Sequence, residues 1–451
     1  MHGTSVVTGS GLTSPAPARW QPGQAAPPGR GERAPAAHPP AAAAQVRRSD
    51  IPASADRRRT SSASDVLLAI LDHGPVPRST IARLAGLSPA AAGRYCTALV
   101  RGGLVREVPR QGGHNGAGRP HVPVDISDQR YVVCGLHIGA LASTLAVLDL
   151  CGRVIARESH PHRGLPPAGI LAWAACRIPG FAAEFAPGRE PLGLGVATGG
   201  WVDPAAGVVV DHPALGWRDV SARDLLAGIA GMPVRIDSHA RALIKAEQLF
   251  GDRRSRDSVV HMFVGNVIDA AFATGGTVHQ GPRSAAGSVA HLPVGGRSGD
   301  CGCGQPGCLQ AAVSEDSLAR RAASAGIIRE PSFLALLASA GAGRAEALYL
   351  MRERARLVGR AAAMLLDVLN PDVLVVAEAG AIRLPGCLDV MRAEVARRSH
   401  TCRDPGRVVV ASSFGEDVLP VSAGAVMLDA IYSDPLGPHV LDPPHEYAPA
   451  S

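Results

Sequence analysis

The chain contains the stretch His-Leu-Pro-Val-Gly-Gly-Arg-Ser-Gly-Asp-Cys-Gly-Cys-Gly-Gln-Pro-Gly-Cys at residues 291–308, and the interpretation of the whole sequence starts from it. It places three of the nine cysteines within eight residues. Three thiolates and an imidazole suit tetrahedral zinc, and a Cys3His set leaves no open position for a reaction. The intervening glycines allow the tight turns that would bring the thiols together. We therefore predict a structural Zn²⁺ held by His291, Cys301, Cys303 and Cys308.

Disulfide formation is the first alternative interpretation of these cysteines. Cys301 and Cys303 are separated by one residue and are too close to form a comfortable disulfide. The N-terminal region also contains no apolar segment of the kind that directs secretion. The other alternative is a group of reduced cysteines that share no ligand.

Two motifs around the cysteines point to a family. The first is Gly287-Ser288-Val289-Ala290-His291, and the second is Cys-x-Cys-Gly-x-x-Gly-Cys-Leu-Gln, which starts at Cys301. Both resemble the signature of the ROK family, which contains sugar-responsive repressors and sugar kinases. The resemblance runs from about Ser62 to about Asp434. It implies that His291 and the three cysteines bind zinc, and that the fold is ribonuclease-H-like, as in actin and sugar kinases.

Length and composition indicate a protein with several domains and substantial cores, since the chain has 451 residues. No apolar run reaches the length of a membrane span, and we expect a cytoplasmic protein with no membrane partner. The net charge of +6 is unevenly spread, because residues 1–60 carry eight arginines against three acids and residues 61–124 carry seven against three. A basic N-terminal part suggests a polyanionic partner, although a charged tail can also serve solubility alone.

Residues 1–60 are rich in Ala, Pro, Gly, Ser and Arg and show no periodic apolar pattern. Such a segment cannot bury enough apolar surface to offset its ordering entropy, so we expect a disordered basic tail. We also expect residues 435–451 to form a flexible tail.

Residues 61–124 are predicted to form a winged helix-turn-helix. A first helix from about Ser64 ends at Gly74-Pro75, and a second opens at Arg78. The third starts at Ser88-Pro89, where Ser88 can cap the helix and Pro89 needs no N–H partner. Strands at 104–108 and 122–125, on either side of a Gly-rich loop, would form the wing. This layout resembles the domain that ROK repressors carry and ROK kinases lack.

The expected partner of this domain is double-stranded DNA, because helix-turn-helix proteins place the third helix in the major groove. We expect a homodimer or homotetramer, whose symmetry matches an inverted-repeat operator. An ordinary small helical domain is the alternative interpretation. The candidate DNA contacts are Arg78, Ser79, Ser88, Pro89, Ala90, Ala91, Arg94, Tyr95 and Arg119.

Residues 125–434 alternate between strands and helices and are predicted to form one effector-binding and dimerisation domain. Strands are expected near 131–138, 192–196, 233–236 and 259–263, and helices near 168–184 and 343–369. A duplicated plan of this kind suits two lobes around a cleft. The predicted fold class is therefore α/β, with a winged helix-turn-helix followed by a two-lobed ribonuclease-H-like ROK domain.

The family resemblance also implies where a kinase would bind ATP, namely at glycine loops whose N–H groups approach the phosphates. The family's Asp-x-Gly-Gly-Thr corresponds here to His137-Ile-Gly-Ala-Leu141, and its Gly-Thr-Gly-Ile-Gly-x-Gly corresponds to Gly265-Asn-Val-Ile-Asp-Ala-Ala271. Where the family has a later glycine triplet, this chain has Ala377-Glu378-Ala379. The family's catalytic Asp aligns with His239. We therefore predict that the chain is not an enzyme. A sugar kinase that uses His239 as its base is the alternative.

In the family, two acids grip the sugar hydroxyls, and here their places are taken by Ser288 and Gln310. This leaves two interpretations open, a changed effector or a pocket that has lost its ligand. We predict a DNA-binding transcriptional regulator, a repressor that senses a sugar or sugar phosphate. A ligand-independent DNA-binding protein is a further alternative. The candidate effector contacts are Gly200, Ser238, His239, Ser288, His291 and Gln310.

Overall fold

The computed structural model of the chain describes residues 61–109, 122–162, 164–295 and 301–437. Three expectations fall on the other residues. The predicted tail at 1–60, most of the predicted tail at 435–451 and the tip of the predicted wing with Arg119 lie outside the described residues.

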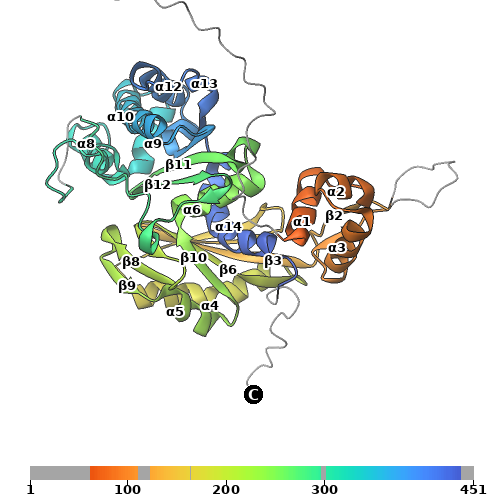
Figure 1. Ribbon diagram of the computed structural model, residues 1–451. Coiled ribbons are helices and arrows are strands. Elements are labelled where there is room, and N and C mark those ends of the chain that lie inside the picture. Colours follow the sequence, from red (N-terminus) through yellow and green to blue (C-terminus); the bar gives the residue numbers. More distant parts are fainter. Residues whose placement is uncertain (1–60, 110–121, 163, 296–300, 438–451) are drawn as a thin grey trace, which may run out of the picture. The chain divides into compact units, whose positions relative to one another are not determined.

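Three helices form the N-terminal domain, and Figure 1 shows them gathered beside β2. Two of them begin at serine caps, because the hydroxyls of Ser61 and Ser88 accept hydrogen bonds from the backbone N–H groups of Ser64 and Ala91. Pro89 takes the first position of the third helix, as the sequence predicted. The helices are α1 (Ser62–His73), α2 (Arg78–Leu84) and α3 (Pro89–Arg101).

Two short strands complete this domain, β1 (Val105–Glu107) and β2 (Val124–Ile126). They pair antiparallel, with Val105 opposite Ile126. Each helix contributes apolar side chains to the core, including the fully buried Val66, Ile81 and Leu99. The order of three helices followed by two paired strands confirms the predicted winged helix-turn-helix.

The first lobe of the following domain is built on a five-stranded sheet with strand order β10-β6-β3-β4-β5. The strands β3, β4 and β5 form an antiparallel meander, whereas β6 and β10 run parallel to β3. Two helices, α4 and α5, cover one face of the sheet through an apolar cluster. The elements of this lobe are β3 (Tyr131–Ile138), β4 (Ala142–Leu148), β5 (Val154–Pro161), α4 (Pro167–Phe185), β6 (Glu190–Thr198), β7 (Trp201–Asp203), β8 (Val208–His212), β9 (Trp217–Val220), α5 (Ala222–Ala230) and β10 (Val234–Ser238).

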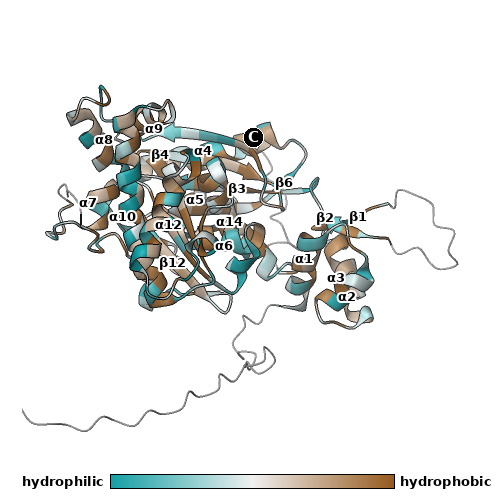
Figure 2. Ribbon diagram, turned by 90° about the horizontal axis from the view of Figure 1, so that it is seen from above, coloured by the Kyte–Doolittle hydropathy of each residue, from teal (hydrophilic) through white to brown (hydrophobic). Residues whose placement is uncertain are grey.

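The second lobe repeats this topology in a sheet of order β13-β12-β11-β14-β15. Here β11, β12 and β13 form the meander, and β14 and β15 run parallel to β11. The long helix α10 packs one face on the core and carries hydrophilic residues on the other, as Figure 2 shows. The elements are β11 (Ser258–Val264), β12 (Ile268–Thr274), β13 (Thr277–Val278), α7 (Leu309–Val313), α8 (Glu315–Ser324), α9 (Phe333–Gly341), α10 (Ala345–Leu369), β14 (Val373–Glu378), α11 (Ala379–Arg383), α12 (Cys387–Arg398), α13 (Pro405–Val408) and β15 (Val409–Ala411).

Two further helices lie against both lobes, α6 (His239–Phe250) and α14 (Val418–Ser433). Helix α14 approaches β3 and β6 closely because two glycines face it. A Cβ added to Gly195 would lie 2.1 Å from the carbonyl oxygen of Ala423, and one added to Gly135 would lie 2.9 Å from the amide nitrogen of Gly424. Helix α6 packs between α14 and the strands β11 and β12. The duplicated sheets and the helices between them confirm the predicted two-lobed α/β fold.

Among the described helices, none is by itself both long and apolar enough to cross a bilayer. The pair α9 and α10 meets those limits of length and composition only when taken together, and it is bent by 112°. Leu336 of α9 and Met351 of α10 are buried in the core of the second lobe.

One ion pair links the winged domain to the first residues beyond α6. Both carboxylate oxygens of Asp72 in α1 accept hydrogen bonds from the guanidinium of Arg256, at 2.5 and 2.6 Å. Arg256 also donates to the carbonyl of Gln248 in α6 at 3.0 Å. Although partial burial alone would raise the pKa of Asp72, Arg256 lowers it below its usual value. This forked pair fixes the end of α1 on the turn after α6.

We expect Asp72→Asn to loosen this junction, because a two-pronged, partly buried ion pair becomes a single neutral hydrogen bond. The loss of stability should be about 1 kcal/mol, and hydrogen exchange of the α1 amides should accelerate. Hydrogen-exchange mass spectrometry measures the effect, with Asp389→Asn in an exposed pair with Arg392 as the control. Equal exchange in α1 for the two variants would contradict the role of this pair.

Candidate metal centre and interlobe pocket

Four candidate metal ligands come together just before α7. The ligand atoms of His291, Cys301, Cys303 and Cys308 all lie within 4.8 Å of one another. The Sγ atom of Cys301 is 3.0 Å from that of Cys303, 3.3 Å from that of Cys308 and 3.5 Å from Nδ1 of His291. Zinc holds such atoms at roughly 2.0–2.3 Å, which brings neighbouring ligand atoms to this kind of separation. The cluster could therefore hold a metal ion, and its donors fit zinc.

The loop that carries these residues turns as the sequence predicted. Pro293 and Cys308 form an antiparallel bridge that brings the two ends of the loop together. Gly302 and Gly304 have φ values of 73°, in the left-handed region that favours glycine. Cys308 is fully buried and directly precedes α7. The thiols thus converge from a closed loop rather than from separate elements.

A cavity of about 890 Å³ adjoins this cluster, and residues of both lobes line it. We call it the interlobe pocket. One predicted effector residue, His239, does not line it, since its side chain is only 3% exposed and lies behind Asp269. Five of the six predicted effector residues do line it, namely Gly200, Ser238, Ser288, His291 and Gln310.

The loop that would cradle phosphates in a kinase is here a tight hairpin between β11 and β12, which rests on the opposite lobe. A Cβ added to Gly199 would lie 2.9 Å from the side chain of Val267. The backbone N–H of Gly200 donates to Oδ2 of Asp269 at 3.0 Å. The amide of Gln310 holds the hairpin from the other side by donating to the carbonyl of Asn266 at 2.6 Å. These contacts hold the hairpin against the first lobe, at the edge of the interlobe pocket.

The third altered loop, Ala377-Glu378-Ala379, also has a structural role. Glu378 is buried and forms an ion pair with Arg354, whose side chain is fully buried. Arg354 donates to the carbonyls of Val264 and Val313, at 3.0 and 2.8 Å, and Glu378 accepts from the N–H of Ala381. A buried pair bonded in this way is unfavourable to break, because one charge would be left without a partner. The loop holds β11, α7 and β14 together.

Asp237 is the carboxylate nearest in sequence to the expected base position, but it is fully engaged. Its Oδ1 accepts from Nε of Arg241 at 2.6 Å, and its Oδ2 lies 2.9 Å from Nζ of Lys245. Burial alone would raise the pKa of Asp237, yet Lys245 and Arg241 hold it below its usual value. Asp237 is therefore a structural anion and not a proton acceptor for a ligand.

Four buried histidines meet where the lobes join, on strands β3, β8 and β11 and at the start of α6. The rings of His137 and His239 stack with centroids 6.0 Å apart. Burial and the neighbouring His239 lower the pKa of His137 and of His261 to about 3, and that of His212 to about 4. Ring nitrogens of His137, His212 and His261 have no hydrogen-bond partner among the described residues. The folded protein therefore holds these three rings neutral.

The exposed face of α3 carries a basic groove, which we call the α3 groove. Arg94, Thr97 and Arg101 recur on this face at helical spacing and, with Arg78 of α2, line an open cavity of about 490 Å³. Within the described residues, Arg94 and Arg101 form no ion pair, so their charges face solvent. Sequence reasoning missed Arg101, although its spacing of seven residues from Arg94 places both on one helix face.

The other predicted DNA contacts differ in their surroundings. Arg78 donates to Oε1 of Glu107 at 2.7 Å, which offsets part of its charge. Tyr95 is half-buried and packs against the apolar core of the domain. Ala91 is half-buried, whereas the remaining described candidates, Ser79, Ser88, Pro89 and Ala90, are exposed. Ser79 lies on α2, whereas Ser88, Pro89 and Ala90 lie at the start of α3.

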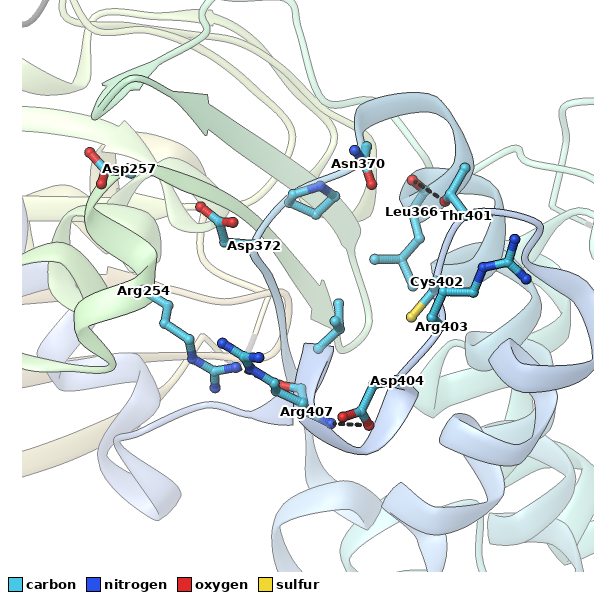
Figure 3. Close-up of a pocket in the computed structure, with 12 residues that line it drawn as sticks. Arg254, Asp257, Leu366, Asn370, Asp372, Thr401, Cys402, Arg403, Asp404 and Arg407 are labelled. Carbon is cyan, nitrogen blue, oxygen red and sulfur yellow. Dashed lines mark hydrogen bonds between the residues drawn. The ribbon is translucent and has the colours of Figure 1, made fainter. Parts of the chain in front are cut away.

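A second cavity, of about 510 Å³, lies at the opposite end of β11 and β14 (Figure 3). Thr401 on its wall donates to the carbonyl of Leu366, and Arg254 is held by Asp252. None of the predicted site residues lies there, and we assign no ligand to it. Its charged lining is balanced between Arg254, Arg403, Arg407, Asp257, Asp372 and Asp404.

The buried histidines predict a loss of stability in mild acid. Because the pKa of His137, His212 and His261 is lowered in the folded state, the unfolded chain binds more protons below about pH 6.5. Stability is therefore full above about pH 6.5 and falls as the pH approaches 4, by up to about 1.4 kcal/mol per pH unit for each histidine. Urea unfolding at several pH values should show this slope, and His261→Leu should reduce it. His400→Leu, at an exposed histidine, is the control. A free energy of unfolding that stays flat between pH 7.5 and 5 would contradict the assignment.

Comparison with known proteins places this geometry in a family. Transcriptional regulator Rv0485 of Mycobacterium tuberculosis is 34% identical over 391 residues, which cover 84% of this chain and 87% of that protein. A putative xylose repressor of a Caldicellulosiruptor species is 27% identical over 326 residues, or 69% of this chain and 81% of that protein.

Among solved structures, a ROK family transcriptional regulator described as a homologue of the Escherichia coli MLC protein has a similar fold. Its TM-score is 0.68 at 20% sequence identity, and the match covers 84% of this chain and 98% of that one. The family model described as "ROK family" matches residues 133–423, more than half of the chain. The chain belongs to the ROK family.

Proposed function

We propose that this protein is a DNA-binding transcriptional regulator, a repressor, whose ROK domain senses a sugar or sugar-derived molecule. The observation that carries the proposal is the α3 groove, where Arg94 and Arg101 stand on an exposed helix with no ionic partner among the described residues. Free guanidinium groups on a third helix suit the phosphates and base edges of a major groove. The relatives named as regulators and repressors support the same function.

The proposed domains follow the sequence-based boundaries. Residues 61–124 bind DNA, and residues 125–434 hold the effector pocket and the contacts of a homodimer or homotetramer. Two copies would present two α3 helices to half-sites related by a twofold axis, which is why the operator is an inverted repeat.

The proposal includes the absence of kinase activity. Val267 and Asp269 occupy the space beside Gly199 and Gly200 where phosphates would lie. Asp269 would also repel a phosphate, and Asp237 is already held by two cations. A sugar kinase acting through His239 would need a path for ATP, and the filled hairpin argues against one.

The role proposed for zinc is structural. His291 and the three cysteines would hold the ion, and the ion would fix the loop that forms one wall of the interlobe pocket. With four protein ligands the site has no open position, so the bound metal would contribute folding energy and no reaction step.

For DNA binding, we expect Arg94→Ala to weaken binding of a selected operator by about 1–3 kcal/mol if the side chain reads a base. Fluorescence anisotropy against the operator and against unrelated DNA measures the difference. Arg83→Ala is the matched control, since Arg83 is exposed on α2 outside the α3 groove. An equal loss on both DNAs would make Arg94 a phosphate contact, and no loss on either would refute the assigned face.

For the metal, we expect the purified chain to contain about one zinc per chain, and Cys303→Ser to lower both the zinc content and the Tm. Elemental analysis and thermal denaturation measure the two quantities, with Cys176→Ser at an exposed thiol elsewhere as the control. A Cys303→Ser protein that keeps its zinc and its Tm would contradict a structural metal site.

A further inference from the structure

The interlobe pocket has an acidic lining that the sequence did not reveal. The two carboxylates with which the family holds sugar hydroxyls are replaced here by Ser288 and Gln310. The described lining residues nevertheless include three other carboxylates, those of Asp211, Asp269 and Asp316. They come from β8, from β12 and from the start of α8. The pocket is therefore lined by carboxylates, but at other positions than in the family's pattern.

The positive charges near the pocket are already engaged. Arg241 is 3% exposed, donates through Nε to Asp237 at 2.6 Å, and uses its two other nitrogens on the carbonyls of Ser284 and Val202. Arg320 pairs with Asp316 in the next turn of α8. Among the described lining residues, no other arginine or lysine remains to receive a phosphate.

Asp269 is the acid that the fold positions most firmly. Its Oδ2 accepts the N–H of Gly200 at 3.0 Å and lies 3.0 Å from Nε2 of His239, while its side chain stays 15% exposed to the pocket. Oδ1 makes no hydrogen bond within the part of the chain that the structure describes. One oxygen thus orients the carboxylate, and the other is left to accept hydrogen bonds from a ligand.

The histidine behind Asp269 faces the carboxylate from the side away from the pocket. His239 is 97% buried by side chain, yet its Nε2 has no hydrogen bond in the described residues, because the nearby carboxylate is not in line with it. A buried polar atom without a partner is unfavourable. Because Asp269 covers this nitrogen and His239 does not line the pocket, a ligand hydroxyl would meet the carboxylate through Oδ1.

We propose that Asp269 is the specificity-determining residue of the interlobe pocket, and that the pocket takes an uncharged, polyhydroxylated ligand while excluding phosphorylated sugars and nucleotides. This inference rests on the proposed function, since it names the class of effector that the ROK domain would sense. Ionised carboxylates accept hydroxyl hydrogen bonds about twice as strongly as neutral groups do. The same charge repels a phosphate at short range in a partly buried site.

The test is calorimetry on the full-length chain with four probes, namely glucose, glucose 6-phosphate, N-acetylglucosamine and N-acetylglucosamine 6-phosphate. Wild type should bind at least one neutral sugar and bind its 6-phosphate at least about tenfold more weakly. Asp269→Asn should weaken the neutral sugar about tenfold and shift the preference toward the phosphate by a similar factor. A role limited to folding would not move this ratio.

Asp372→Asn provides the matched control, because it removes the same charge in the other cavity (Figure 3) and should leave both affinities unchanged. Three results would overturn the inference. They are equal or tighter binding of a 6-phosphate by wild type, an unchanged ratio in Asp269→Asn, and no binding of either neutral sugar.

Titrations repeated in the presence of operator DNA separate this inference from the proposed function. Selective sugar binding that leaves DNA affinity unchanged would sustain the role of Asp269 and refute the sensor. Conversely, DNA affinity that responds to a 6-phosphate would sustain the sensor and refute the specificity assigned to Asp269.

Discussion

The cleft of this protein depends on one contact between its lobes, where the β11–β12 hairpin rests on Gly199 and Gly200. Val267 packs on the first glycine, and Asp269 accepts the N–H of the second. In this position the hairpin directs one carboxylate oxygen toward the pocket and brings the lobes into direct contact. The buried Arg354–Glu378 pair stabilises the second lobe next to this hairpin, since Arg354 also donates to the carbonyl of Val264 at the end of β11. This joint between the lobes borders the interlobe pocket.

A continuous set of contacts runs from this joint to the winged domain. Helix α6 begins at His239, directly behind Asp269. Near the end of the helix the carbonyl of Gln248 accepts from Arg256, which holds Asp72 of α1. Apolar residues of α1 and α14 also share one buried cluster. A ligand can change DNA affinity only as far as it binds two lobe arrangements unequally. Helix α6 is the element through which such a difference would reach α1.

The sequence was sufficient for the fold class and for much of the site. Capping at Ser88-Pro89, the strand pattern and the spacing of Cys301, Cys303 and Cys308 are local signals, and the structure agrees with each. The acidic lining was not predictable, because Asp211 and Asp269 come from strands of different lobes and meet only in the folded chain. The ion pair of Glu378 was not predictable from the sequence, since Glu378 ends strand β14 and its partner Arg354 lies 24 residues away on helix α10.

We propose that this fold acts through sequence-specific DNA binding rather than through phosphoryl transfer. The most direct measurement incubates the purified full-length chain with fragmented genomic DNA at physiological salt and sequences the retained fragments. We expect a few strongly enriched sites, each an inverted repeat whose half-sites lie about one or two helical turns apart. Retained DNA with the same composition as the input, from a protein that phosphorylates a sugar with ATP, would contradict it.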